Sequence, residues 1–329
     1  RRKGRVRRPF VPPFNRPSLG LFNDHCDQVD RRFGLSDLHV RGFAQRCTLV
    51  PEGLRIQATG DVDLTTKRLV LALGASEQPE WPTWAPRNDP GVHHLFDREF
   101  DQWPTPRERV LIVGGGITAA HLALRLLDEG HEVTLVSRHP LRHHQFDSDP
   151  GWLGEYYASR FQRSASADHR RSLITAARHT GSVPPDLGRR LRRAIARRGL
   201  RWHEGDVTSL DRTDHELRIR LAQEEVLTAD RVLLATGFSP RRPGGAMLDR
   251  LIDDAELPCA ACGFPIVDAH LRWHPRIFVS GPLAELELGP VSRNIAGARW
   301  AAERIVSAAR GGHAARPGLR HPLEHPVKA

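Results

Sequence analysis

Residues 109–138 hold the pattern that most constrains the fold of this chain: an apolar run, a glycine turn, a helical stretch and a second apolar run. Arg109–Val113 has the β-branched composition of a buried parallel strand. The helical stretch ends at Gly130, which is a natural stop for a helix. A second strand is then predicted over Glu132–Ser137. This strand–turn–helix–strand order predicts an α/β fold with a Rossmann-like domain.

The glycine turn itself indicates a dinucleotide site, with a plain βαβ packing unit as the alternative. Gly114 permits a tight turn, and Gly116 lets the backbone approach a pyrophosphate. The small side chain of Ala119 allows close packing of helix and strand. The start of the helix offers unpaired N–H groups and a positive dipole end to phosphate. The cofactor-binding residues predicted here are Gly114, Gly115, Gly116, Ile117 and Ala119.

The end of the second strand favours NADP(H) over NAD(H). A site for NAD(H) usually has Asp or Glu there, which accepts hydrogen bonds from the ribose hydroxyls. This chain has Ser137 and Arg138 instead, with Arg142 close behind. A guanidinium suits a 2′-phosphate. The alternative is that Arg138 is one surface arginine among many, because the chain contains only three lysines.

Composition limits the class of protein. With 329 residues, of which 39% are hydrophobic, the chain is long enough for two domains with separate cores. We expect a cytoplasmic protein, because no apolar run is long enough for a membrane helix and four cysteines do not make a disulfide framework. The net charge of +10 is explained by arginine-rich composition and anionic cofactors, so neither nucleic acid nor a membrane is expected as a partner. The oligomeric state is left open.

Other helices and strands are expected on both sides of the glycine turn. Helices are predicted over Ser18–Phe33, in two or three segments over Tyr156–Arg198, near Met247–Asp253, and over Arg293–Ala309. Strands are predicted at Leu38–Gly42, Arg46–Val50, Leu54–Ala58, Lys67–Leu73, Arg231–Thr236 and Arg276–Ser280. A small antiparallel sheet is predicted from Leu200–His203, Val207–Leu210, Leu217–Leu221 and Glu225–Leu227. Glu77–Pro90 is expected to be a crossover loop, and the residues after Gly311 to be disordered.

The dinucleotide unit lies in the middle of the chain, between two segments that are expected to form a second domain together. Each flank contains a strand that ends in a small-residue turn, at Gly74 and at Gly237. The division expected is residues 1–105 and 235–311 as two parts of one domain, residues 106–234 as the NAD(P)H-binding domain, and residues 312–329 as a tail.

These features resemble the flavoproteins with two dinucleotide-binding domains, and in particular the lysine/ornithine N-hydroxylase-like family. Asp230–Phe238, with the sequence DRVLLATGF, is similar to the motif D-x-x-x-(L/F)-A-T-G-(Y/F) of N-hydroxylating monooxygenases. His144–Gly154 and Arg276–Ala298 also look like segments of uncharacterised members. The resemblance covers residues 18–310 and implies an NADPH domain inserted into an FAD-binding Rossmann-like domain.

The sequence departs from this family in two places. The family begins with its own glycine fingerprint for the ADP half of FAD, and none precedes residue 109 here. The second FAD motif usually ends its strand in Gly-Asp, whereas this chain has Gly281-Pro282. We therefore expect the FAD-binding domain to be truncated.

The resemblance also implies positions for the remaining site residues. FAD contacts are expected from Gly74, Thr236, Gly237, Gly281, Gly289, Pro290 and Asn294. The helix beginning near Asn294 would direct its N-terminus at the flavin. Asn294 and Gln145 are the candidates for catalytic residues. The alternative at Gly289, Pro290 and Asn294 is an ordinary capped helix. The alternative at Gly74 and Gly237 is a simple turn that ends a strand.

Two further motifs have competing interpretations. Asp147-x-Asp149-Pro150 suits an acid/base pair or, preferably, an Asx-type turn, and no metal site is expected. Cys259-Ala-Ala-Cys262 suits a redox dithiol or, preferably, two small buried residues. The family resemblance thus implies an NADPH-dependent flavin monooxygenase that acts on the nitrogen of an amine or amino acid with O₂. The alternatives are a flavin reductase or dithiol oxidoreductase, and a non-catalytic NADP(H)-binding remnant.

Overall fold

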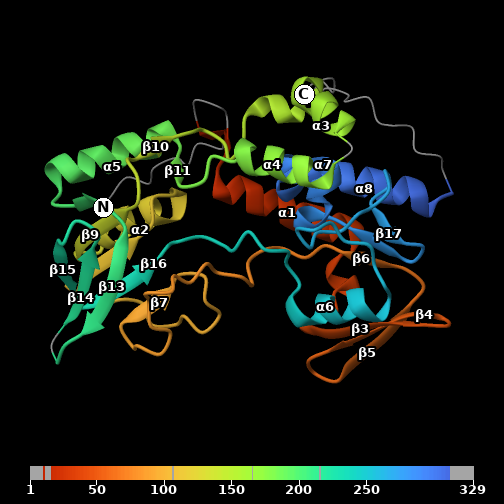
Figure 1. Cartoon of the computed structure of the whole chain (residues 1–329), viewed down its shortest axis with the longest axis horizontal. Coiled ribbons are helices and arrows are strands. Elements are labelled where there is room, and N and C mark those ends of the chain that lie inside the picture. The colour runs from red at the N-terminus through yellow and green to blue at the C-terminus, as the bar shows by residue number, and fades with distance from the viewer. Residues whose placement is uncertain (1–9, 12–15, 106, 165, 215, 312–329) are drawn as a thin grey trace. The chain divides into compact units, whose positions relative to one another are not determined.

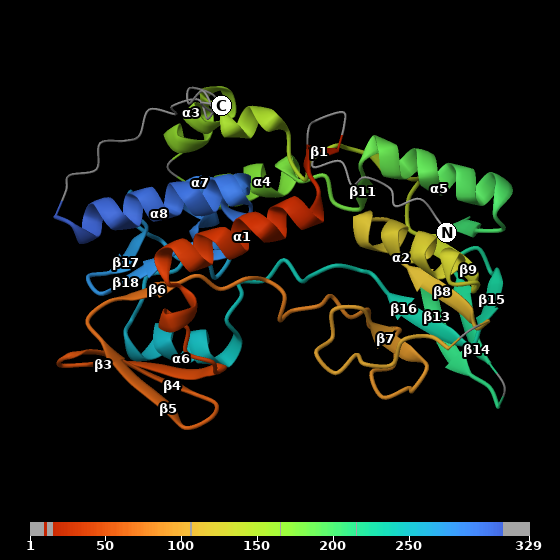
Figure 2. The same ribbon diagram turned by 180° about the vertical axis from the view of Figure 1, so that it is seen from behind.

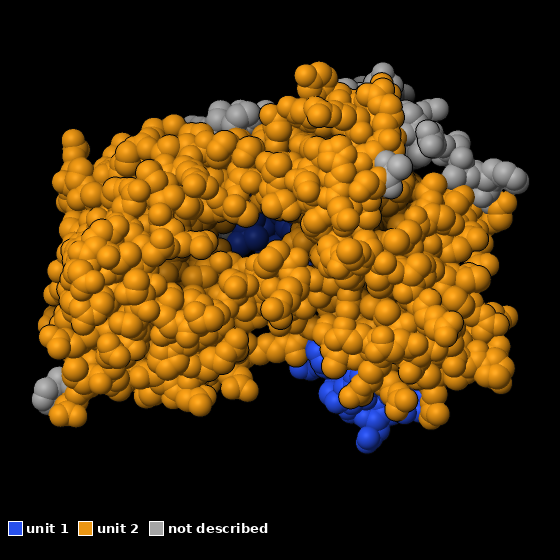
Figure 3. Space-filling model, viewed as in Figure 1, with its two compact units in different colours: residues 1–45, 56–64 blue, residues 46–55, 65–329 orange. Residues whose placement is uncertain are grey.

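The computed structural model describes residues 10–11, 16–105, 107–164, 166–214 and 216–311 (Figure 1). Its contacts divide the chain into two units, which are coloured separately in Figure 3. Unit 1 comprises residues 1–45 and 56–64, and unit 2 comprises residues 46–55 and 65–329. The expected disorder after residue 311 lies outside the described residues.

Unit 1 contains one long helix, α1 (Leu19–Phe33), after two short antiparallel strands, β1 (Phe10–Val11) and β2 (Arg16–Pro17). The hydroxyl of Ser18 accepts a hydrogen bond from the amide of Leu21 over 3.3 Å, and Gly34 ends the helix at a φ of +59°. The predicted helix is confirmed, although none of its side chains is buried. The strand expected at 38–42 is wrong, because a 3₁₀ turn, η1 (Ser36–Leu38), occupies its start.

Strands β3 (Ala44–Val50), β4 (Gly53–Ala58) and β5 (Val62–Thr66) follow along the stretch where the boundary between the units falls. The strands predicted at 46–50 and 54–58 are confirmed, and β5 was not expected. The sequence VDLTT of β5 has too little apolar alternation to be recognised as a strand.

The centre of unit 2 is a five-stranded parallel sheet of order β12-β9-β8-β16-β7. Its strands are β7 (Val92–His94), β8 (Arg109–Val113), β9 (Glu132–Ser137), β12 (Arg201–Glu204) and β16 (Arg231–Leu234). The nearly continuous apolar sequences of β8, β9 and β16 suit a sheet that is covered on both faces. The register places Val113 opposite Val136 and Leu234, so the ends of β8, β9 and β16 lie at one edge of the sheet.

Helices α2 (Ile117–Asp128) and α5 (Pro185–Arg197) cover one face of this sheet (Figures 1 and 2). The alternate strand residues face β13 (Val207–Arg212), β14 (Leu217–Leu221) and β15 (Val226–Ala229), which form an antiparallel sheet. The antiparallel sheet is therefore confirmed for three of its four predicted strands. The fourth is wrong, because β12 pairs in parallel with β9, where Trp202 lies opposite Leu135.

A second sheet joins the two flanks of the central unit. β6 (Leu69–Leu71) pairs in parallel with β18 (Ile277–Val279), which pairs with β17 (Arg272–His274). All five strands of the central sheet lie between β6 and β18 along the chain. The predicted insertion of one α/β unit into another is therefore visible in the strand pairing.

The remaining segments surround this second sheet and the carboxyl end of β9. They are β10 (Arg142–His143), η2 (Pro150–Leu153), α3 (Glu155–Arg163), α4 (Ala167–Ala177), β11 (Ser182–Val183), α6 (Gly245–Asp254), η3 (Gly281–Ala284), α7 (Glu285–Leu288), η4 (Pro290–Arg293) and α8 (Ile295–Ala309). The predicted helices at 156–198, 247–253 and 293–309 are confirmed. No helix among the described residues is both long and apolar enough to cross a membrane.

Candidate functional site

The glycine turn connects β8 directly to the start of α2. Gly114 has a φ of +149°, and a Cβ atom there would collide with the carbonyl oxygen of Ala235. Gly116 precedes α2 without a side-chain cap, so the first amides of this helix receive no side-chain acceptor. Ile117 is 47% exposed at the helix start, whereas Ala119 is fully buried. This arrangement is suited to an anion at the N-terminus of α2.

The end of β9 lies against the second glycine of the turn. A Cβ atom on Gly115 would lie 3.2 Å from the side chains of Ser137 and His139. Ser137 is buried, and its hydroxyl donates to the carbonyl oxygen of His139 and accepts from Trp202 Nε1, each over 2.9 Å. The Ser137 hydroxyl is therefore engaged within the protein, and the exposed residues that follow it are the ones available to a ligand.

Arg138 and Arg142 are both exposed. In the described part of the chain, neither guanidinium has a hydrogen-bond or ion-pair partner. An arginine without a carboxylate partner beside a helix N-terminus keeps its full charge for an incoming anion. These two residues lie where the sequence predicts them.

His139 covers the glycine turn and was not expected at the site. Its imidazole Nε2 lies 2.5 Å from the position of a Cβ on Gly181, which has a φ of +68°. The loop between α4 and β11 thus approaches the turn through a glycine, with His139 between them. The only sequence signal was the position of His139 two residues beyond the predicted strand.

Thr236 and Gly237 follow the end of β16 and lie next to a buried histidine. The amide of Phe96 donates to His94 Nδ1 over 3.2 Å, so His94 Nε2 carries the proton and donates to the Thr236 hydroxyl over 3.1 Å. Thr236 in turn donates to the carbonyl oxygen of Glu80 over 2.5 Å. Burial lowers the pKa of His94 to about 4, which keeps this imidazole neutral at neutral pH. Gly237 has a φ of +87°, and no atom lies near its missing side chain.

Gly74 and Gly281 lie at the carboxyl ends of the paired strands β6 and β18. The amide of Ser280 donates to the carbonyl oxygen of Leu71 over 2.9 Å. Gly281 then adopts a φ of +61°, and its Cβ position lies 3.6 Å from the carbonyl oxygen of Leu73. The strand pairing therefore brings together two turns that are about 200 residues apart in the sequence.

The turn before α8 is fixed by packing contacts and hydrogen bonds. Gly289 has a φ of +76°, and its Cβ position contacts Trp152 and Phe161. Pro290 is buried, and its carbonyl oxygen accepts from Arg178 over 3.2 Å. The side chain of Asn294 caps α8 by accepting from the amide of Gly297 over 3.0 Å. Asn294 is therefore a structural cap whose helix N-terminus faces the same turn.

A buried carboxylate, Glu285, is the main feature that sequence reasoning missed. It is fully buried and forms ion pairs with Arg171, with Arg293 at 2.8 Å and with Arg178 at 3.7 Å. Arg178 also pairs with Asp147, and burial lowers its pKa. The segment ELEL gave no sequence signal, because its partners come from α4 and η4.

The loop over 143–152 is confirmed to contain an Asx-type turn at Asp149. Its carboxylate accepts from the amide of Gly151 over 2.7 Å. Gln145 is half-buried, and its side chain has no hydrogen-bond partner among the described residues. Cys259 and Cys262 are free thiols, and burial raises the pKa of Cys259.

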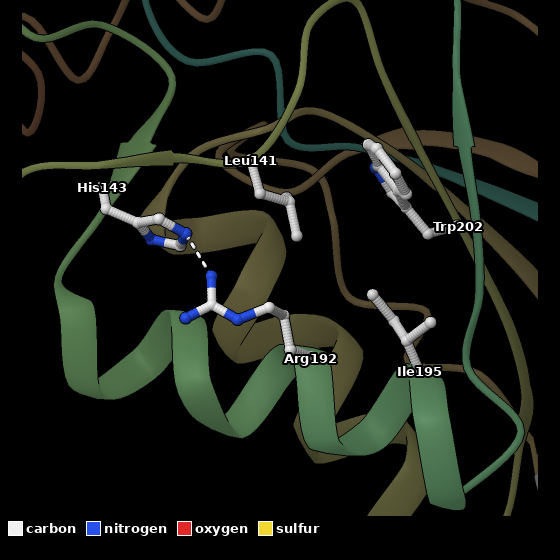
Figure 4. A pocket seen from close by; sticks show the side chains of 5 residues that line it. All are labelled: Leu141, His143, Arg192, Ile195 and Trp202. Carbon is white, nitrogen blue, oxygen red and sulfur yellow. Dashed lines mark hydrogen bonds between the residues drawn. The ribbon is translucent and has the colours of Figure 1, made fainter.

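A cavity of about 460 Å³ lies beside the end of β9 (Figure 4). Five side chains line it: Leu141, His143, Arg192, Ile195 and Trp202. Trp202 connects this cavity to the glycine turn, because its indole N–H binds Ser137, which contacts Gly115.

Comparison with known proteins agrees with this geometry. Residues 40–304 match the family described as pyridine nucleotide-disulphide oxidoreductase. The chain belongs to this family. It is therefore an oxidoreductase by family, and the predicted α/β class is confirmed.

Solved structures with the same fold include two ornithine N-hydroxylases. The enzyme from Kutzneria sp. 744 is 19% identical, with a TM-score of 0.71 over 90% of this chain and 77% of that one. The enzyme from Pseudomonas aeruginosa is 20% identical, with a TM-score of 0.67 over 87% and 74%. Bacillithiol disulfide reductase from Bacillus cereus is 16% identical, with a TM-score of 0.59 over 93% and 82%. The resemblance to two-dinucleotide-domain flavoproteins is thus confirmed for the fold.

Sequence relatives overlap only partly with this chain. The nitric oxide reductase FlRd-NAD(+) reductase of Salmonella gallinarum is 25% identical over 185 residues, which is 54% of this chain. The zeta-carotene desaturase of Zea mays is 32% identical over 101 residues, which is 31% of this chain. The matches span 36% and 17% of the lengths of these two relatives.

Proposed function

We propose that this protein is an NADPH-dependent flavin monooxygenase that hydroxylates the nitrogen of a small amine or amino acid. The observation that carries the proposal is the pairing of β6 with β18 around an inserted parallel sheet. Two ornithine N-hydroxylases share this fold, and the motif ending in Thr236-Gly237 resembles theirs. The proposed partners are therefore the amine substrate and O₂.

NADP(H) would bind along the edge formed by the ends of β8 and β9. The amides at Gly115 and Gly116 and the uncapped start of α2 suit its pyrophosphate. The exposed guanidinium of Arg138 suits the 2′-phosphate, and Arg142 adds a second positive charge nearby. The hydroxyl of Ser137 is already hydrogen-bonded within the protein. Ser137 would therefore act by packing against Gly115 and not by binding the nucleotide.

The turns at Gly74 and Gly281 are suited to FAD. They follow two adjacent strands, and a glycine in each turn leaves room for a ligand because it has no side chain. Gly281 also has a positive φ. When bound, FAD would accept hydride from NADPH and react with O₂. The N-terminus of α8, capped by Asn294, would favour negative charge on the reduced flavin beside Gly289 and Pro290. The sequence holds one glycine fingerprint, which is assigned here to NADP(H), so the turns at Gly74 and Gly281 are the ones proposed for FAD.

Gln145 is the residue we propose for the substrate side. It lies in the loop that follows β10, and its amide is free among the described residues. Asn294 would act by orienting α8, because its side chain is occupied as a cap.

A dithiol oxidoreductase is the second candidate, because the family name includes disulphide chemistry and Cys259 and Cys262 are free thiols within one C-x-x-C motif. Burial works against it, since a raised pKa leaves little thiolate on Cys259 at neutral pH. Replacing both cysteines by Ser should abolish turnover with dithiol substrates if this candidate is right.

The experiment measures FAD binding, NADPH oxidation and O₂ uptake with the purified chain and a panel of diamines and basic amino acids. Gly116→Ala is the decisive variant, because its Cβ would meet only Gly181 at 3.8 Å and the fold should be retained. We expect loss of NADPH binding and turnover. Gly20→Ala, whose Cβ enters open space, is the matched control. A chain that binds NADPH but not FAD would support the non-catalytic remnant instead.

A further inference from the structure

The cavity beside β9 combines an apolar wall with one uncompensated positive charge. Leu141, Ile195 and Trp202 supply the wall, and the side chains of His143 and Arg192 meet at the other side of the cavity (Figure 4). Its volume of about 460 Å³ lies within the ~300–1,000 Å³ typical of small-molecule sites. Such a combination suits a flat ring that carries an anionic group.

The charge belongs to Arg192 on α5. Its guanidinium donates to His143 Nε2 over 2.5 Å. Within the residues that the structure describes, no carboxylate pairs with Arg192, whereas Arg198 on the same helix pairs with Asp128 at 2.6 Å. Burial, and then the charges of Arg192 and His144, lower the pKa of His143, so the imidazole leaves the positive charge uncompensated.

A glycine in α5 leaves space for the imidazole of His143, although glycine destabilises the helix. Gly188 lies four residues before Arg192 in α5, where glycine is about 1 kcal/mol less favourable than alanine. A Cβ there would collide with the imidazole of His143. His143 is also fixed by its backbone, because β10 pairs with β11 and places His143 opposite Val183. The position of the imidazole is therefore fixed, and its hydrogen bond orients the guanidinium of Arg192.

Trp202 links the wall of this cavity to the proposed nucleotide site. Trp202 donates to Ser137, and Ser137 packs against Gly115 of the glycine turn. A ligand whose pyrophosphate lies at this turn would therefore present its adenosine end to the cavity.

We propose that this cavity receives the adenosine end of NADP(H), with Trp202 against the adenine ring and Arg192 as a specificity-determining residue for the 2′-phosphate, in addition to Arg138. The proposal rests on the proposed binding of NADP(H) at the glycine turn. In this proposal, residues of α5 and β12 recognise the nucleotide together with the arginines that follow β9.

The test uses 2′,5′-ADP, 5′-AMP, NADPH and NADH as calorimetric probes of the full chain. Arg192→Gln should lower affinity for 2′,5′-ADP and NADPH by roughly 10- to 100-fold, as for one charge-assisted contact, and leave 5′-AMP within about twofold. Trp202→Leu should weaken 2′,5′-ADP and 5′-AMP by similar factors, because it removes contact with the ring that both share.

Arg193→Gln is the matched control, since it removes an exposed arginine from the neighbouring position of the same helix. Gln is a good helix former, so both variants should fold, which circular dichroism verifies. Equal affinities of the Arg192 and Arg193 variants for 2′,5′-ADP would overturn the inference. If Gly116→Ala still abolishes NADPH binding in that case, the proposed function stands without it. A wild-type chain that binds none of the four probes would overturn both.

Discussion

The guanidinium of Arg178 donates to the main-chain carbonyl oxygen of Pro290 over 3.2 Å and also pairs with Asp147. One side chain at the end of α4 therefore joins the loop after β10 to the turn that precedes α8. These two segments are the ones proposed to face the substrate and the flavin. The contact links both sides of the proposed reaction centre through a single, partly buried cation.

Arg178→Gln should therefore destabilise the protein by about 1–3 kcal/mol, because it removes a charged donor from a carbonyl and two carboxylates. Denaturant unfolding followed by circular dichroism measures the change. Arg160→Gln, at an exposed position of α3, is the control and should stay within about 0.5 kcal/mol of wild type. Equal midpoints for both variants would contradict the role of Arg178.

Glu285→Gln should have a larger effect, because it leaves arginine charges without their buried carboxylate. Arg171 and Arg293 both bind this carboxylate, and breaking such a buried pair typically costs about 3–5 kcal/mol. Thermal and urea unfolding report the loss. Glu303→Gln breaks an exposed pair with Arg299 on α8 and should cost less than about 1 kcal/mol. A Glu285 variant as stable as the Glu303 variant would show that the buried cluster contributes little.

The buried His94 should make stability depend on pH. Its folded-state pKa of about 4 lies below the unfolded value of about 6.5, so the folded state binds fewer protons between these values. The contribution is complete above pH 6.5 and is lost as the pH falls toward 4, to a total of about 3 kcal/mol. In His94→Gln, which stays neutral, the difference in unfolding free energy from wild type should shrink over this window. A difference that is independent of pH would refute the assignment.

Arg138→Glu should lower NADPH affinity by about 1–3 kcal/mol and change NADH affinity little, since the lost contact is with the 2′-phosphate. The fold should be unaffected, because Arg138 is exposed and has no partner among the described residues. Titration of each coenzyme measures the two affinities separately. Equal losses for NADPH and NADH would remove the 2′-phosphate role from Arg138.

Sequence reasoning placed the elements around the glycine turn almost residue by residue. Arg109–Val113 and Glu132–Ser137 were bounded correctly because their apolar runs end at glycine or a polar residue. It failed for β12, whose RWHE sequence looks like part of an antiparallel sheet but pairs in parallel with β9. A short strand carries no information about its partner, because pairing depends on how distant segments pack.

The sequence by itself determined the glycine turn, the insertion of one α/β unit into another and the position of the arginines after β9, because these depend on local backbone conformation and chain order. Only the tertiary structure decided which distant side chains meet. It placed Glu285 among arginines from α4 and η4, His94 on Thr236, and Arg192 beside His143. These contacts arise when elements far apart in the chain bury polar groups together, and a buried charge or imidazole is stable only where such partners are present.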